Sequence, residues 1–100
     1  MRIITKKPIE VFATKYPDSR TALDSWLKII GENTFSNFSQ LRKIFPSADK
    51  IEKCTVFNIG GNKVRLIAAI HYNRNIIYIR EVLTHADYDT GKWQGKCVNQ

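Results

Sequence analysis

A short stretch near the C-terminus gathers side chains that can move protons. It contains an imidazole, two carboxylates, a phenol and an ammonium group, supplied by His85, Asp87, Tyr88, Asp89 and Lys92. Cleavage of RNA needs a base that takes the proton of the 2′ hydroxyl, an acid for the leaving 5′ oxygen, and cations for the charge that builds up on the phosphate. The stretch therefore contains the kinds of group that a ribonuclease uses.

These groups have a structural interpretation as well as a chemical one. An imidazole ionises nearer neutral pH than other side chains, so His85 is the natural proton carrier. The forked guanidinium of Arg65 suits a phosphate, and Tyr88 can donate to an oxygen or stack on a base. Alternatively, Asp87 and Asp89 only cap a helical turn, Tyr88 fills the core and His85 is structural. The residue types alone leave both interpretations open.

Two β-prone segments, 63–71 and 76–83, contribute further cations. In the first, side-chain alternation puts Lys63 and Arg65 on the face opposite the apolar one. In the second, the same rule predicts two faces, one with Ile77, Ile79 and Glu81 and the other with Ile76, Tyr78, Arg80 and Val82. Because antiparallel neighbours run in opposite directions, we expect Arg65 and Arg80 to lie close together as a cationic patch. The structural alternative is a solvated strand edge.

The N-terminal third of the chain is predicted to hold one strand followed by a helix. The run 2–5 is short and β-prone, and Pro8 follows at a place where a first helical turn accepts proline. Pro17 then ends the helix, since proline cannot continue one. The apolar residues recur at helical spacing and are Ile9, Phe12, Ala13 and Tyr16.

Two more helical segments are expected before residue 46. The first begins at Arg20, with Asp18 or Ser19 as its cap and Gly31 as its left-handed terminator. Its apolar face consists of Leu23, Trp26, Leu27 and Ile30. It forms a hairpin with the preceding helix, and the last segment begins near Ser36 and stops before Pro46.

The second half of the chain has the pattern of strands and tight turns. Strands are predicted at 56–59, 63–71 and 76–83, joined by turns at 60–62 and 73–75 that are rich in glycine and asparagine. Consecutive strands with tight turns form an antiparallel meander. We therefore predict an α+β fold in which an N-terminal strand and a helical hairpin pack on an antiparallel sheet.

Composition points to one basic domain spanning residues 1–100. The chain is 43% hydrophobic, and no apolar run approaches the ~20 residues of a membrane-spanning helix. The N-terminus lacks the pattern of a secretory signal, so we expect the cytoplasm. The formal net charge is +7, from 16 Lys and Arg against 9 Asp and Glu. Such a charge predicts attraction to a polyanion such as nucleic acid.

The chain shows no sequence pattern for a metal site or a disulfide framework. Cys54 and Cys97 are far apart, without a CxxC motif or paired histidines, so we expect two free thiols. The clustered acidic ligands of metal-dependent nucleases are also missing from the sequence. A metal-independent reaction without a cofactor is therefore favoured.

Three segments in combination resemble the HigB family of bacterial type II toxins, within the RelE superfamily. They are 56–68 (Val-Phe-Asn-Ile-Gly-Gly-Asn-Lys-Val-Arg-Leu-Ile-Ala), 78–80 (Tyr-Ile-Arg) and 84–89 (Thr-His-Ala-Asp-Tyr-Asp). The resemblance extends over essentially the whole chain. It implies a RelE-like fold and a small basic endoribonuclease that cuts mRNA, usually on the ribosome. It also implies neutralisation by a co-expressed antitoxin of the HigA type.

The resemblance also implies roles for individual residues. Family members cleave RNA by attack of the 2′ hydroxyl, without metal, and leave a 2′,3′-cyclic phosphate. The matching positions here are Arg65 as phosphate clamp, His85 as proton carrier and Tyr88 for substrate positioning. Lys50 and Lys53 do not align with the lysines that the RelE branch uses, so the general base stays open.

Three functional hypotheses follow. The first is an RNA-cleaving toxin with two sets of residues, the catalytic Arg65, His85 and Tyr88 and the RNA-binding Lys63, Arg80 and Lys92. In it, Arg65 and His85 should both lie outside the core. The second is a non-catalytic module that uses the same basic face to bind RNA or an antitoxin. The third is a degenerate toxin retained as a regulator.

Overall fold

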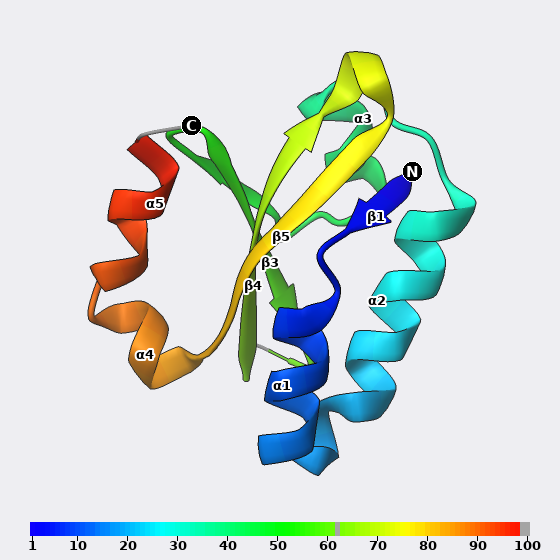
Figure 1. Ribbon diagram of the computed structural model, residues 1–100. Helices are drawn as coiled ribbons and strands as arrows, with labels where there is room; N and C mark the ends of the chain where they lie inside the picture. Colours follow the sequence, from blue (N-terminus) through cyan, green and yellow to red (C-terminus); the bar gives the residue numbers. More distant parts are fainter. Residues whose placement is uncertain (62, 99–100) are drawn as a thin grey trace.

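The protein is built on one five-stranded sheet with helices on both faces (Figure 1). The computed structural model describes residues 1–61 and 63–98 of the 100-residue chain. The strands follow the order β1-β5-β4-β3-β2 across the sheet, and only β1 and β5 are parallel neighbours. The predicted α+β class and the antiparallel meander are confirmed. In the described part of the chain, no helix is long and apolar enough to cross a membrane.

The strands agree with the predicted segments and add one more. They are Arg2–Ile4 (β1), Asp49–Ile51 (β2), Cys54–Ile59 (β3), Val64–His71 (β4) and Ile76–Thr84 (β5). Gly60 and Gly61 have φ angles of 63° and 66°, and Asn75 has 57°, as the tight turns require. The short strand β2 was not predicted, because its three residues carry no clear β pattern.

The three predicted helices are confirmed in order, and the described part of the chain has two more short helices near its C-terminus. The helices are Lys7–Lys15 (α1), Arg20–Glu32 (α2), Phe38–Ile44 (α3), His85–Asp89 (α4) and Gly95–Val98 (α5), with single 3-10 turns at Pro17–Ser19, Tyr72–Arg74 and Lys92–Gln94. The prediction that Gly31 ends the helix is wrong: α2 continues to Glu32, and the next residue, Asn33, has an extended conformation. Ser19 occupies the predicted N-cap position of α2, but its side chain does not cap the helix, because its Oγ donates to the Tyr16 carbonyl (2.6 Å).

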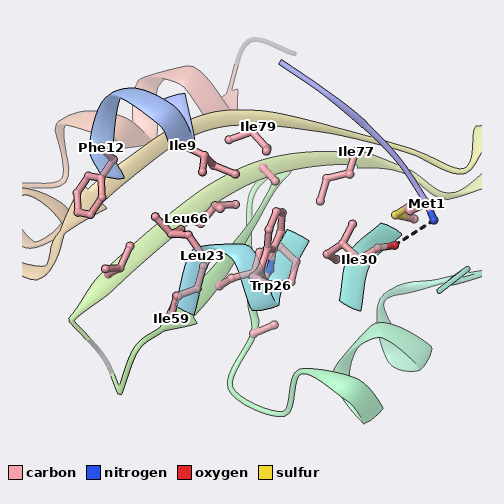
Figure 2. Packing of buried hydrophobic residues seen from close by; sticks show 14 of the residues in the cluster. Met1, Ile9, Phe12, Leu23, Trp26, Ile30, Ile59, Leu66, Ile77 and Ile79 are labelled. Carbon is pink, nitrogen blue, oxygen red and sulfur yellow. Dashed lines mark hydrogen bonds between the residues drawn. The ribbon is translucent and has the colours of Figure 1, made fainter. Parts of the chain in front are cut away.

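The main core lies between one face of the sheet and helices α1, α2 and α3 (Figure 2). Ile9 of α1 and Leu23, Trp26 and Ile30 of α2 are almost completely buried against the sheet. The sheet contributes its alternate residues, among them Val64, Leu66, Ala68, Ile77 and Ile79. The apolar face predicted for 63–71 is therefore the face that packs on the helices.

A β-bulge in β5 changes which way its later side chains point. Ala68 pairs with Ile79 but Ile67 pairs with Glu81, so Arg80 is an extra residue opposite this step. Beyond the bulge, Val82 packs in the main core instead of facing away from Ile77 and Ile79. The predicted alternation of 76–83 is therefore wrong beyond Ile79.

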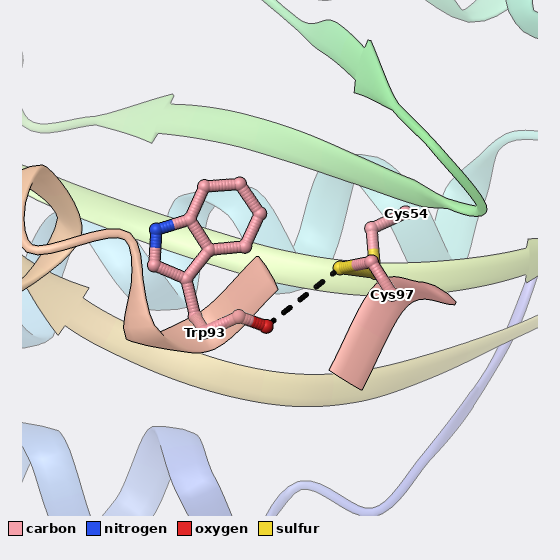
Figure 3. The surroundings of a disulfide bond; sticks show 3 residues. All are labelled: Cys54, Trp93 and Cys97. Atoms are coloured by element: carbon pink, nitrogen blue, oxygen red, sulfur yellow. Dashed lines mark hydrogen bonds between the residues drawn. A yellow bond between two sulfur atoms is a disulfide. The ribbon is translucent and has the colours of Figure 1, made fainter. Parts of the chain in front are cut away.

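The opposite face of the sheet is covered by the C-terminal segment. Trp93 and the buried pair Cys54 and Cys97 form a second apolar cluster with Val56 and Ile67. The two cysteines are joined in a disulfide that ties α5 to the start of β3, with Trp93 beside it (Figure 3). The prediction of two free thiols is wrong. The prediction failed because α5 returns to the sheet. This return places the Cα atoms of the two cysteines 5.3 Å apart, although 43 residues separate them in the sequence.

Loss of the disulfide should destabilise the fold. Reduction, or a Cys54→Ala and Cys97→Ala double variant, should lower the free energy of unfolding by about 2–4 kcal/mol, because the unfolded chain regains the freedom of a long loop. Urea unfolding with and without a thiol reductant measures the change. The double variant is the control and should not respond to the reductant. Equal unfolding midpoints for the oxidised and reduced wild type would contradict this assignment.

Candidate active site

Arg65 lies on β4 beneath the C-terminal segment. Its neighbours in register are Asn58 of β3 and Leu83 of β5. Its guanidinium carbon lies 5.3 Å from the centroid of the Tyr88 ring on α4, and the residue is only 9% exposed. The expectation that Arg65 lies outside the core is therefore wrong, because α4 folds back over this face.

Tyr88 is held between Arg65 and a buried tryptophan. The rings of Tyr88 and Trp93 are stacked, with centroids 4.9 Å apart and planes 14° apart. The indole N–H of Trp93 donates to the Tyr88 carbonyl (2.9 Å), and Trp93 is 3% exposed. The guanidinium, the phenol and the indole thus form successive layers. This packing fixes the ring of Tyr88 against Arg65.

His85 and Asp89 form an exposed pair on α4. His85 Nδ1 lies 2.9 Å from Asp89 Oδ2, one helical turn away, and the two side chains are 54% and 61% exposed. Thr84 caps the helix, since its Oγ1 accepts from the Asp87 N–H (3.2 Å). With Nδ1–H donated to Asp89, the His85 Nε2 is the nitrogen that can exchange a proton with a substrate. The expectation that His85 lies outside the core is confirmed.

The sheet register brings the histidine and the arginine to the same end of the molecule. Val64 pairs with Thr84, so Arg65, the second residue of β4, and His85, the first residue after β5, both lie next to this pair. Tyr88 lies one turn after His85 on α4 and covers Arg65. The three residues predicted to be catalytic therefore gather where β4 begins and β5 ends.

The electrostatic surroundings keep the Tyr88 hydroxyl protonated. Burial raises the pKa of the phenol above its usual 10.0, the Arg65 guanidinium lowers it, and the carboxylates of Asp49 and Asp89 raise it again. The net direction is upward. At neutral pH, Tyr88 is thus a neutral hydrogen-bond donor.

The Tyr88→Phe variant should therefore lack one phenol that ionises above pH 10. Folding raises this pKa, so the neutral phenol contributes to the stability of the folded state. This contribution to the free energy of unfolding is complete below about pH 10, and it disappears as the pH rises through the folded-state pKa. Near-ultraviolet absorbance titrations of the wild type and the variant measure the difference. A difference curve that rises below pH 10 would contradict the prediction.

The three predicted RNA-binding cations lie at different places around this site. Lys63 is exposed in the turn before β4, and Lys92 is exposed after α4. Arg80 lies at the bulge, with its guanidinium carbon 5.6 Å from the centroid of the Tyr78 ring. It does not pair with Arg65 in the sheet as the expected cationic patch requires, because the register partner of Arg65 is Leu83. Within residues 1–61 and 63–98, no three His, Cys, Asp or Glu side chains cluster as metal ligands would.

Sequence reasoning named Asp89 but not its pairing with His85, and it missed Asp49. The spacing of His85 and Asp89 by four residues predicts a contact on one helical face, a signal that was available once α4 was recognised as a helix. Asp49 affects Tyr88 from β2. It could not be found, because β2 itself was not predicted.

Comparison with known proteins places this chain among bacterial toxins. A family model described as HigB_toxin, the RelE-like toxic component of a toxin-antitoxin system, matches residues 19–91. The mRNA interferase toxin HigB of Escherichia coli (strain K12) is 38% identical over 92 residues, which cover 89% of this chain and 88% of the relative. The mRNA interferase HigB of Shigella flexneri matches with the same values. That of Escherichia coli O6:H1 is 37% identical, with 89% of each chain covered.

Proposed function

Since this chain belongs to the HigB toxin family, the RelE-like toxic components of toxin-antitoxin systems, we propose that it is an mRNA interferase like its named relatives. The observation that carries the proposal is the cluster at the end of β5. There a guanidinium, a phenol and an imidazole lie together at one end of the sheet, with the imidazole paired to a carboxylate. These groups match the needs of RNA cleavage by internal transesterification.

In the proposed reaction, the 2′ hydroxyl of the RNA attacks the adjacent phosphorus and gives up its proton to a base. The bond to the 5′ oxygen breaks and that oxygen is protonated, which leaves a 2′,3′-cyclic phosphate and a 5′ hydroxyl. His85 carries a proton through Nε2, while Asp89 orients the ring. Arg65 stabilises the charge on the phosphorane, and Tyr88 donates to the substrate as a neutral phenol.

The exposed cations near the site are proposed to bind the RNA backbone. Lys63 lies in the turn before β4 and Lys92 in the segment after α4, so the two lysines flank the cluster. Arg80 lies earlier in β5, at the bulge. Contacts of this kind release counterions, so RNA affinity should fall steeply with salt. The net charge of +7 supports such an electrostatic contribution.

The partner of a toxin of this kind is an antitoxin. We propose that it is of the HigA type, that the substrate is mRNA on the ribosome, and that the protein acts in the cytoplasm. The cytoplasm reduces thiols, so the Cys54–Cys97 disulfide would be exposed to reduction there.

Controlled expression of the full chain, with and without the neighbouring gene, tests the proposal. Mapped 5′ ends of cellular transcripts should show new cuts inside reading frames, and the cuts should vanish when the neighbour is present. Purified protein should also cut RNA in excess chelator and leave cyclic phosphate ends. Salt-sensitive RNA binding without new ends would instead indicate a binding module, and induction without any growth defect would indicate a degenerate toxin.

A further inference from the structure

Residues from the tip of the α1–α2 hairpin and from the turn between β3 and β4 line a pocket outside the candidate active site. Figure 1 shows the two segments near each other at one end of the sheet. The pocket has a volume of about 550 Å³, within the usual range for small-molecule sites. Its apolar lining includes Phe12, Ala22 and Val64. No role for it follows from the chemistry described above.

The polar lining of this pocket comes from few residues. Tyr16 is 38% exposed, although its ring packs at 4.7 Å on Phe12. The ammonium of Lys15 lies 5.5 Å from the centre of the Tyr16 ring, and Lys63 lines the pocket from the opposite turn. Asp18 adds one carboxylate. The partly exposed Tyr16 ring thus contacts Phe12 and the Lys15 ammonium, and Ser19 and Thr84 add two hydroxyls to the same lining.

The pocket and the candidate active site lie at the same end of the sheet but on opposite faces of it. Val64 and Thr84, which pair with each other across the sheet, both line the pocket. The next residue after each is Arg65 or His85, only about 3.8 Å away between consecutive Cα atoms. A strand of RNA with its scissile phosphate near Arg65 therefore meets the pocket where it rounds this end of the sheet.

We infer that this pocket, here called the Tyr16 pocket, binds an unstacked base of the RNA close to the scissile phosphate. The inference rests on the proposed ribonuclease function. The ring of Tyr16 supplies the stacking surface, Lys15 and Lys63 bind flanking phosphates, and Asp18 accepts a hydrogen bond from an amino group of the base. An acidic peptide would meet the same two lysines and the same carboxylate, and the exposed part of the Tyr16 ring beside them favours a nucleobase.

Fluorescence of RNA that carries 2-aminopurine at successive positions tests this inference. A 2′-O-methyl group at the scissile nucleotide removes the nucleophile, so that binding is measured without cleavage. One position next to the scissile phosphate should be quenched by the wild-type chain. The quenching should disappear in Tyr16→Leu, which keeps an apolar contact with Phe12, and persist in Tyr16→Phe.

Cleavage kinetics provide the second measurement. Tyr16→Leu should raise KM for a short RNA about tenfold, the size expected for loss of one base–aromatic stack, while kcat changes little. Lys15→Ala should raise KM as well. The matched controls are Ile44→Ala, another exposed apolar residue, and Lys28→Ala, another exposed lysine on a helix, neither of which lines the pocket. Both should keep the wild-type KM.

The outcomes separate this inference from the proposed function. Cleavage by the wild type with no quenched position, and with an unchanged KM in Tyr16→Leu, overturns the Tyr16 pocket as a base site. Weaker antitoxin binding in Tyr16→Leu, without any effect on RNA, overturns it in favour of a peptide site. Quenching that depends on Tyr16 in a wild-type chain that cuts no RNA supports base binding and refutes the ribonuclease proposal.

Discussion

Replacing Arg65 with alanine should lower the rate of RNA cleavage by about 10²–10³-fold, the usual effect of removing one group that stabilises transition-state charge. Arg65 is the cation packed directly on Tyr88 and close in register to the start of α4. Arg65→Lys should restore only part of the rate, because an ammonium cannot bind two phosphate oxygens as the guanidinium fork does. Single-turnover cleavage of a short RNA by the purified variants measures the effect.

The fold of the Arg65→Ala variant must be measured at the same time, because Arg65 is 9% exposed. Loss of the contact between the guanidinium and Tyr88 should cost about 0.5–2 kcal/mol of stability, so the variant should still fold. Arg74→Ala is the matched control: it removes the same charge from the turn at the far end of β4 and β5. Near wild-type cleavage by a folded Arg65→Ala variant would remove Arg65 from the mechanism.

Local patterns were sufficient to predict most of the elements. The helical spacing of Ile9 and Phe12, ended by Pro17, predicts α1, and the glycine pair at 60–61 predicts the turn between β3 and β4. Both signals act over a few residues, which is why they can be recognised in one sequence. The meander follows, because tight turns join neighbouring strands.

Contacts between distant segments could not be predicted in this way. The pairing of Cys54 with Cys97 depends on the return of α5 to the sheet, and no local pattern indicates that return. The bulge at Arg80 reverses the later faces of β5 because of one extra residue in the ladder. Helix ends also depend on context: Gly31 can end a helix but does not need to do so.

The location of the candidate site at one end of the sheet was predicted, but the burial of Arg65 within it was not. Strand direction alone brings Arg65 and His85 to one end of the sheet, as the register of β4 and β5 confirms. The burial of Arg65 under Tyr88 depends on the second apolar cluster around Trp93. That cluster exists because the C-terminal segment covers a face that the sequence analysis had left open to solvent.

Replacing His85 with alanine should lower cleavage by about 10²–10⁴-fold and remove from the pH–rate profile the limb that the imidazole produces. Asp89→Ala should have a much smaller effect, since so exposed a pair contributes at most about 1 kcal/mol, or about fivefold in rate. The chain offers a matched control in His71, an exposed histidine at the far end of β4 beside Tyr78. His71→Ala should cleave RNA at the wild-type rate. If His85→Ala and His71→Ala have equal rates and equal pH profiles, proton transfer must be assigned to another group, and the part of the cluster in catalysis would be limited to Arg65 and Tyr88.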